Sequence, residues 1–158
     1  MASSLSDRLR QTIREVPDFP IPGILFKDIA PVFLDPDLMQ DCVEGLASPW
    51  RTSSPTKVLG IESRGFLFGP QLATSLGAGF VMIRKKGKLP PETIEVSYDL
   101  EYGQATLESV KGSLEPGDRV IIHDDLLATG GTAAAAAQLA QKLGAEVVGF
   151  SFIAALSF

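Results

Sequence analysis

The stretch from Val120 to Thr132, which reads VIIHDDLLATGGT, is the part of the sequence that says most about the fold. The apolar residues 120–122 predict a buried strand, and the small residues that end the stretch predict a tight loop opening into a helix over 132–143. Asp124 and Asp125 follow the strand directly. Ligands of open α/β sheets bind at the carboxyl ends of strands. The stretch therefore predicts an α/β fold with a ligand site at this point.

The loop has the properties of a phosphate cradle. Small residues let main-chain N–H groups approach an anion, and the following helix N-terminus adds partial positive charge. Two carboxylates beside a phosphate repel it unless something separates the charges, and a ribose does so by donating its hydroxyls to them. The loop is neither a Walker loop, because Thr132 stands where that motif needs lysine, nor a G-x-G-x-x-G fingerprint. The alternative is an ordinary turn with Asp124-Asp125 as a cap.

The rest of the chain alternates strands and helices around this stretch. Strands are predicted over 57–61, 80–83, 119–122 and 147–155, with helices over 66–76 and 132–143. This order predicts a mostly parallel central sheet with helices on both faces, and residues 93–98 and 104–107 add an antiparallel ribbon. Near the start, Ser6 is expected to cap a helix that carries Leu9, Ile13 and Val16 and ends at Pro17. Three prolines make 17–23 a loop, and Asp35-Pro36 begins another helix.

Composition narrows the class of protein. The 158 residues include 14 Lys plus Arg against 19 Asp plus Glu, a formal net charge of −5, which disfavours a general binder of nucleic acid or anionic membranes. Cys42 and His123 are the only residues of their kinds. A disulfide within the chain and a zinc site rich in Cys or His are therefore excluded. We expect one domain and a cytoplasmic location, because no targeting segment is visible.

Several blocks besides the opening stretch resemble, in the same order, those of one enzyme family. They are 17–29, 62–69, 83–90 and 97–103. The chain resembles the type I phosphoribosyltransferases across essentially its whole length, and most closely those that use adenine. The resemblance implies transfer of a pentosyl group in purine salvage, in which adenine and 5-phosphoribosyl 1-pyrophosphate (PRPP) give AMP and pyrophosphate. It also implies a homodimer, Mg²⁺, a flexible lid ribbon and an N-terminal hood segment of about residues 1–34.

The resemblance also assigns roles to residues. The catalytic set is Glu101, Asp124 and Asp125, and the 5′-phosphate loop is Ala128, Thr129, Gly130, Gly131 and Thr132. The residues assigned to pyrophosphate binding are Ser63, Arg64, Lys85 and Lys88. Those assigned to adenine binding are Leu25, Phe26 and Lys27. In this assignment the ring of Phe26 stacks on the base, and the main chain of its two neighbours binds the base edge. No residue binds the metal directly, because PRPP carries it. The Glu62–Ser63 peptide bond is expected to be cis.

The residues alone leave other interpretations open for these positions. Arg64 could be a surface arginine, Phe26 a core residue and Glu101 a charge on the ribbon surface. The four cations of residues 84–88 are, on composition, typical of a solvated face, although after a buried strand they also suit a lid that neutralises pyrophosphate.

Three features depart from the family pattern. His123 stands where an apolar residue is usual, and we expect a satisfied strand residue rather than a catalytic one. Ala154-Ala155 replaces a region that is commonly acidic, and the apolar end at Phe158 suggests a truncated C-terminus. Two other functions stay open. A non-catalytic PRPP-sensing regulator would need a partner-binding element, such as a basic DNA-binding domain, and none precedes Ser6. An attenuated enzyme would fit the departures at the C-terminal end.

Overall fold

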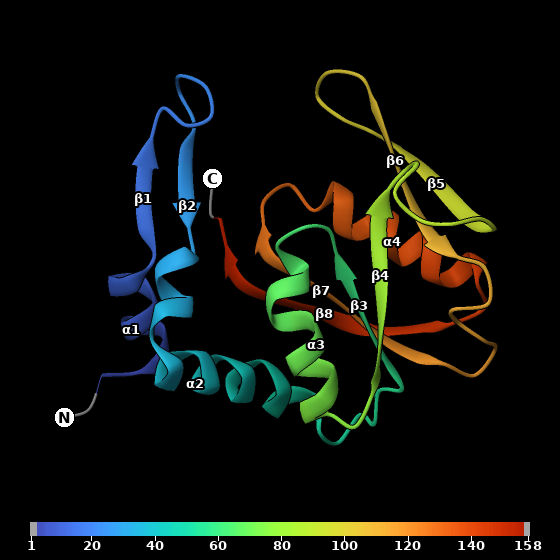
Figure 1. Ribbon diagram of the computed structural model, residues 1–158, viewed down its shortest axis with the longest axis horizontal. Coiled ribbons are helices and arrows are strands. Elements are labelled where there is room, and N and C mark those ends of the chain that lie inside the picture. Colours follow the sequence, from blue (N-terminus) through green and yellow to red (C-terminus); the bar gives the residue numbers. More distant parts are fainter. Residues whose placement is uncertain (1–2, 157–158) are drawn as a thin grey trace. The chain divides into compact units, whose positions relative to one another are not determined.

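The computed structural model describes residues 3–156, and the chain divides into two compact units, Met1–Gly45 and Leu46–Phe158. The first unit contains α1 (Leu5–Thr12), β1 (Arg14–Pro17), β2 (Leu25–Asp28) and the short 3₁₀ helix η1 (Ala30–Leu34), and α2 (Pro36–Ala47) begins in it. Strands β1 and β2 form a two-stranded antiparallel sheet (Figure 1, blue). The predicted base-binding residues lie on β2.

The predicted first helix is wrong at both ends. Ser4, not Ser6, caps it, since the Ser4 hydroxyl accepts a hydrogen bond of 3.2 Å from the N–H of Asp7. The helix ends at Thr12, and Val16 belongs to β1, where it pairs with Phe26. Cross-strand ion pairs Arg14–Asp28 and Lys27–Glu15 accompany this pairing. The helical spacing of apolar residues would have continued the helix by one more turn, to Val16. Strand pairing in the hairpin is favoured over that turn.

The second predicted helix start is confirmed. Asp35 precedes α2, and its Oδ1 atom accepts hydrogen bonds of 3.0 Å from the N–H groups of both Asp37 and Leu38. Pro36 occupies the first helical position, where its missing N–H costs no hydrogen bond.

The second unit is built on a six-stranded sheet with the order β5-β6-β4-β3-β7-β8 (Figure 1). Strands β3 (Lys57–Ile61), β4 (Gly79–Lys85), β7 (Arg119–Leu127) and β8 (Glu146–Ala155) are parallel neighbours. Strands β5 (Thr93–Asp99) and β6 (Gln104–Val110) form the antiparallel ribbon, which joins the sheet where β6 pairs with β4. The mostly parallel sheet and its ribbon are confirmed. A short 3₁₀ helix, η2 (Ser48–Trp50), lies before β3.

Helices cover both faces of this sheet, as predicted. Alternate residues of β3 show it: Leu59 packs in a cluster with Leu139 and Ala140 of α4 (Gly131–Lys142). Val58, pointing the other way, packs with Leu72 of α3 (Gly65–Ser75). In the described range 3–156, no helix is long and apolar enough to cross a membrane.

Strand β7 is longer than predicted. It continues to Leu127 because β8 pairs with it as far as Ala155. Asp124 and Asp125 therefore lie among the last residues of the strand rather than in the loop, and only residues 128–130 separate that strand from α4. The two carboxylates are held by the sheet itself.

Candidate active site

Two of the predicted ligand-binding residues, Arg64 and Asp125, are brought together by the ends of β3 and β7. These strands are parallel neighbours, so the residues that follow β3 lie beside the end of β7. The Nε atom of Arg64 forms an ion pair of 3.0 Å with Oδ2 of Asp125, whose side chain is almost completely buried. Ser63 is exposed beside Arg64, and the Glu62–Ser63 peptide bond is cis, as the resemblance implied.

Gly65 allows this approach. A Cβ atom at Gly65 would lie 2.9 Å from the carbonyl oxygen of His123 and 3.4 Å from Oδ1 of Asp124. Any side chain here would push the start of α3 away from β7. The glycine therefore sets how closely Arg64 can approach the carboxylates.

The two adjacent carboxyl groups have unequal electrostatic settings. Burial raises the pKa of Asp124 to about 7, helped by the neighbouring Asp125 carboxyl and opposed by the Asp125 N–H group and Arg64. The Asp125 N–H donates to Oδ1 of Asp124 at 2.8 Å. The oxygen atoms of the two carboxyl groups can accept hydrogen bonds from hydroxyl donors, such as those of a ribose.

The residues predicted to hold the 5′-phosphate lie between the end of β7 and the first turn of α4. Gly130 caps α4 with φ +86°, a left-handed conformation that most side chains would strain. A cavity of about 80 Å³ lies at this point, and its lining includes Asp124, Phe152, Thr132 and residues 127–130. The helix N-terminus and the loop N–H groups make this cavity a suitable anion site.

Tyr98 is a member of the site that the sequence analysis missed. Its hydroxyl shares a hydrogen bond of 3.2 Å with Oγ1 of Thr132, and its ring lies 3.9 Å from the position of a Cβ at Gly131. The residue comes from β5, so the ribbon contacts the phosphate loop directly. No local pattern around Tyr98 indicated this, because the contact joins segments 34 residues apart.

The cationic segment 84–88 is divided into paired and unpaired charges. Arg84 binds Glu62 at 2.8 Å and Lys86 binds Glu95 at 3.0 Å. Lys85 and Lys88 are exposed, and among residues 3–156 neither ammonium group has an ion-pair partner. These two are the lysines that the resemblance assigns to pyrophosphate.

The remaining predicted site residues are Glu101, in the turn between β5 and β6, and the three base-binding residues of the first unit. Glu101 lies exposed in the turn between β5 and β6, and within the described range no residue forms a hydrogen bond or ion pair with it. In the first unit, the Phe26 ring packs edge-on against Phe19 with centroids 5.1 Å apart, and Leu25 and Lys27 flank it on β2. Ala154 and Ala155 pair with the end of β7.

His123 corrects an expectation. It is fully buried on β7, but in the described range neither ring nitrogen makes a hydrogen bond of normal geometry, although the Ser151 main chain is near. Burial lowers its pKa to about 4, opposed by the Ser151 main chain and the Asp125 carboxylate. The residue is thus a neutral and unsatisfied imidazole rather than a satisfied one.

We expect His123→Val to stabilise the protein. Removing a buried unpaired polar group should add about 1–3 kcal/mol to the free energy of unfolding at pH 7.5. The unfolded imidazole binds a proton below its usual pKa of 6.5, whereas the folded one does so only near 4. Wild-type stability should therefore fall between pH 6.5 and 4, by at most about 1.4 kcal/mol per pH unit from this group.

Urea unfolding of both proteins at pH 7.5 and pH 5 checks this expectation. The advantage of the valine variant should grow at pH 5, because valine has no proton to gain. An advantage that is absent at pH 7.5, or that shrinks on acidification, would show that His123 has a partner in the folded protein.

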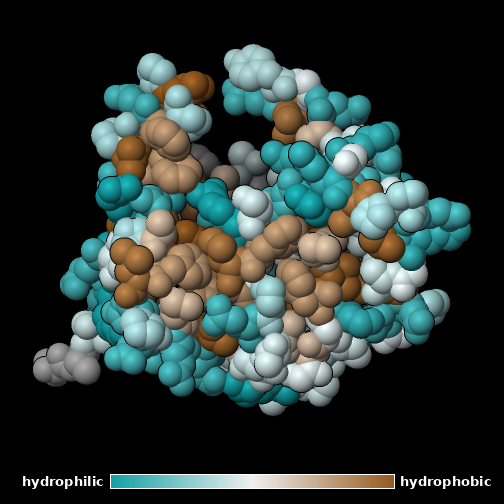
Figure 2. Space-filling model, in the orientation of Figure 1, coloured by the Kyte–Doolittle hydropathy of each residue, from teal (hydrophilic) through white to brown (hydrophobic). Residues whose placement is uncertain are grey.

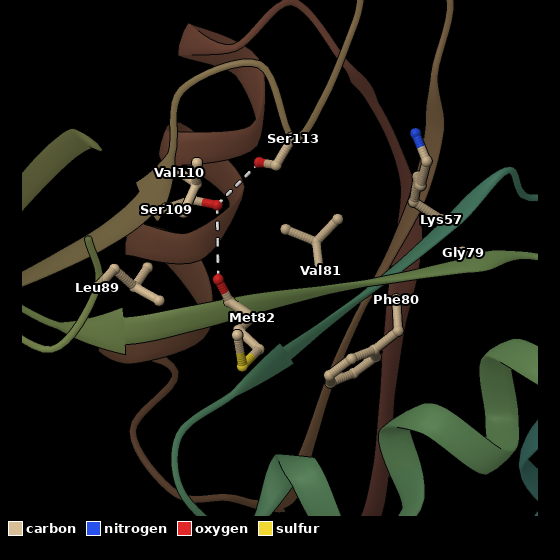
Figure 3. Close-up of a pocket in the computed structure, with 9 residues that line it drawn as sticks. All are labelled: Lys57, Gly79, Phe80, Val81, Met82, Leu89, Ser109, Val110 and Ser113. Carbon is tan, nitrogen blue, oxygen red and sulfur yellow. Dashed lines mark hydrogen bonds between the residues drawn. The ribbon is translucent and has the colours of Figure 1, made fainter. Parts of the chain in front are cut away.

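A larger cavity of about 310 Å³ lies elsewhere on the second unit (Figure 3). It opens where β4 and β6 separate beyond their paired residues, and Val81, Leu89 and Val110 are among its lining. Its hydroxyl groups are engaged, since the Ser109 side chain bridges to the Met82 carbonyl and to Ser113. Its one cation, Lys57, is paired with Asp118 at 3.0 Å. It lacks the anion-binding groups that the phosphate loop offers.

A glycine-containing loop between β7 and α4, an acidic pair before it and an arginine that follows the neighbouring strand β3 are the arrangement expected of a phosphoribosyltransferase. The family model described as the phosphoribosyl transferase domain matches residues 36–155. This range contains every site residue described above except those on β2.

Comparison with individual proteins narrows this class. Adenine phosphoribosyltransferase of Synechococcus sp. (strain JA-3-3Ab) is 56% identical over 151 residues, which cover 95% of this chain and 86% of that protein. The crystal structure of the Rhodothermus marinus enzyme has a TM-score of 0.92 at 54% identity, covering 96% of this chain and 86% of that one. The Saccharomyces cerevisiae enzyme, complexed with adenine and an imino-altritol bisphosphate, has a TM-score of 0.92 at 40% identity, covering 98% and 90%. The chain belongs to the adenine phosphoribosyltransferases.

Proposed function

We propose that the chain transfers the 5-phosphoribosyl group of PRPP to adenine, forming AMP and releasing pyrophosphate. The observation that carries this proposal is the cluster at the end of β7, where an acidic pair, a phosphate loop and Arg64 meet. The base nitrogen forms a bond to the anomeric carbon of the ribose as the bond to pyrophosphate breaks. Glycosidic bonds of this kind break through a cation-like state, which nearby carboxylates stabilise.

The residues divide the substrate among them. Residues 128–132 hold the 5′-phosphate, and Asp124 and Asp125 accept hydrogen bonds from the ribose hydroxyls. Ser63, Arg64, Lys85 and Lys88 hold the departing pyrophosphate, whose charge the cations offset. On the base, the ring of Phe26 stacks on adenine, the main chain of its neighbours binds the base edge, and Glu101 assists proton movement. Such charged substrates point to the cytoplasm as the place of reaction.

Magnesium fits this site as part of the substrate. Within residues 3–156, no group of three or more His, Cys, Asp or Glu side chains could hold a metal ion. Mg²⁺ commonly binds phosphates and water together with few protein ligands, so PRPP itself supplies suitable oxygens. Bound there, the ion would add positive charge beside the leaving pyrophosphate. Arg64, Lys85 and Lys88 would contact the same pyrophosphate oxygens without needing the metal.

An assay of AMP formation tests the proposal. Purified protein is mixed with adenine, PRPP and MgCl₂, and AMP and pyrophosphate are measured together. Equal amounts of both products support the enzyme. Binding of PRPP without any AMP would instead identify a PRPP-sensing regulator, and slow but stoichiometric turnover would identify an attenuated enzyme.

We expect PRPP with Mg²⁺ to protect the cationic segment 84–88, called the cationic loop from here on, from trypsin. Lys85 and Lys88 are exposed and unpaired among the described residues, and a bound anion would occupy the ammonium groups that trypsin has to recognise. Cleavage within residues 84–100 should slow by about tenfold at a PRPP concentration ten times its Kd, since only the free protein is cut. Cleavage after Lys111, in the exposed turn that follows β6, is the internal control. Equal rates at both places with and without ligand would argue against the role of the loop.

We also propose that the active protein is a homodimer. Leu67 of α3 and Met82 of β4 are large apolar residues that are 44% and 46% exposed. Figure 2 shows apolar side chains gathered on the molecular face over α3. A patch of this kind on a water-facing surface is typical of an interface. Sedimentation velocity measures the state directly, and a monomer at micromolar concentration with full activity would exclude it.

A further inference from the structure

Glu108 is a buried carboxylate, and none of the site roles proposed above involves it. It lies on β6, opposite Arg84 of β4 and Glu95 of β5, and only 2% of it is exposed. Its Oε1 atom accepts hydrogen bonds from the N–H groups of Lys88 at 2.9 Å and Leu89 at 2.8 Å. An ionised group is tolerated at such depth only when it is paired or hydrogen-bonded. The cationic loop supplies these hydrogen bonds.

The carboxylate is ionised in this setting. Burial alone would raise the pKa of Glu108, but hydrogen bonds from the main chain of Leu89, Gly87 and Lys88 and from the Thr93 side chain lower it below its usual value. A charged acceptor binds N–H donors about twice as strongly as a neutral one. The charge of Glu108 therefore contributes to holding the loop.

A second carboxylate holds the other end of the same loop. Oε2 of Glu62, at the end of β3, accepts hydrogen bonds from Nε of Arg84 at 2.8 Å and from the N–H of Lys85 at 3.1 Å. Arg84 in turn donates to the carbonyl of Lys88 at 3.2 Å. The loop is thus tied to β3 and β6 through its main chain, at Lys85 and at Lys88.

These anchors bind main-chain atoms and leave the lysine side chains available. The Lys85 and Lys88 ammonium groups extend from backbone positions that are already ordered, so less entropy is lost when an anion binds them. We propose that Glu108 is a positioning residue for the reaction, which fixes the main chain at Lys88 so that the loop can bind the pyrophosphate of PRPP. The inference rests on the proposed function of the chain.

The test compares Glu108→Gln with the matched control Glu95→Gln. Glu95 lies directly across from Glu108 on β5, carries the same charge and is paired with the side chain of Lys86, and no hydrogen bond joins its side chain to the main chain of the loop among the described residues. Glu108→Gln should raise KM for PRPP by about 10-fold, because the amide oxygen still accepts these hydrogen bonds but lacks the charge that strengthens them. KM for adenine should stay within about twofold, because the residues proposed to bind the base are on β2 and not in this loop. Glu95→Gln should change neither constant by more than that.

The outcomes separate this inference from the proposed function. A wild-type protein that forms no AMP contradicts the function itself. A wild-type enzyme that is active, together with a Glu108→Gln variant of unchanged KM for PRPP, overturns the positioning role alone, as does an equal rise in both KM values. Should Glu108→Gln fail to fold, Glu62→Gln replaces it. That side chain is 13% exposed and ties the other end of the loop, so its KM for PRPP should also rise while KM for adenine does not.

Discussion

Adenine should be preferred over hypoxanthine by roughly 30-fold to 10⁴-fold in kcat/KM. Adenine presents an exocyclic amine donor and an N1 acceptor, and hypoxanthine reverses both groups. A site that offers a main-chain carbonyl to the amine and an N–H to N1 would leave two buried polar groups unpaired with hypoxanthine. Each unpaired group costs about 1–3 kcal/mol, which gives the stated range when both are counted.

The register of the β1–β2 hairpin supports main-chain reading of the base. Pro17 pairs with Leu25 but has no N–H, so the pair that exchanges two hydrogen bonds is Val16 with Phe26. The neighbours on β2, Leu25 and Lys27, therefore direct their N–H and C=O groups away from β1. Among residues 3–156 no third strand joins this sheet, so these groups face an open edge.

Two variants separate main-chain reading from side-chain contributions. Lys27→Ala should change the adenine preference little, because its side chain is engaged with Glu15 in a partly exposed ion pair. Phe26→Ala should weaken adenine and hypoxanthine alike, by about 1–3 kcal/mol of lost stacking. Steady-state kinetics with both bases measure these effects. Comparable kcat/KM for the two bases in the wild type would overturn the adenine assignment and leave the phosphoribosyl assignment intact.

Asp125→Asn should lower kcat by about a hundredfold or more, the scale of losing one electrostatic stabiliser of a transition state. The same change should shift the melting temperature by only a few degrees. It breaks the ion pair with Arg64, but Arg64 is 37% exposed and can be solvated by water. It also removes a negative charge beside Asp124, whose pKa is raised mainly by burial and to a lesser extent by the Asp125 carboxyl.

Asp118→Asn is the matched control for this change. Asp118 is also a carboxylate at one end of β7, but it lies at the opposite end of the strand and accepts hydrogen bonds from Thr56, Lys57 and the Glu115 N–H. Its replacement should lower the melting temperature and leave kcat near the wild-type value. Thermal unfolding and turnover measured on both variants give the comparison. Unchanged turnover in Asp125→Asn would remove the ribose role.

Sequence patterns were most reliable where local chemistry permits one conformation. Asp35-Pro36 started a helix, and the glycine-rich loop after β7 opened one, because caps, prolines and glycines act on their nearest neighbours. The first helix failed for the opposite reason. Its last turn was marginal by itself, and pairing with β2, whose residues lie 8 to 14 positions further along the chain, drew residues 14–17 into a strand.

The site divides in the same way. Local patterns were enough to predict the glycine-rich loop after β7, the acidic pair before it and a mostly parallel sheet, because each depends on neighbouring residues. The order of the strands in the sheet came from the structure. Which charges are paired also depends on the tertiary structure. Nothing local distinguishes Lys85 from Lys86, or Glu108 from a surface carboxylate, because their partners come from other strands. The same holds for Tyr98 at Thr132 and for the unsatisfied His123. Burial and pairing are properties of the assembled sheet, and they set which of the predicted charges remain free to bind a substrate.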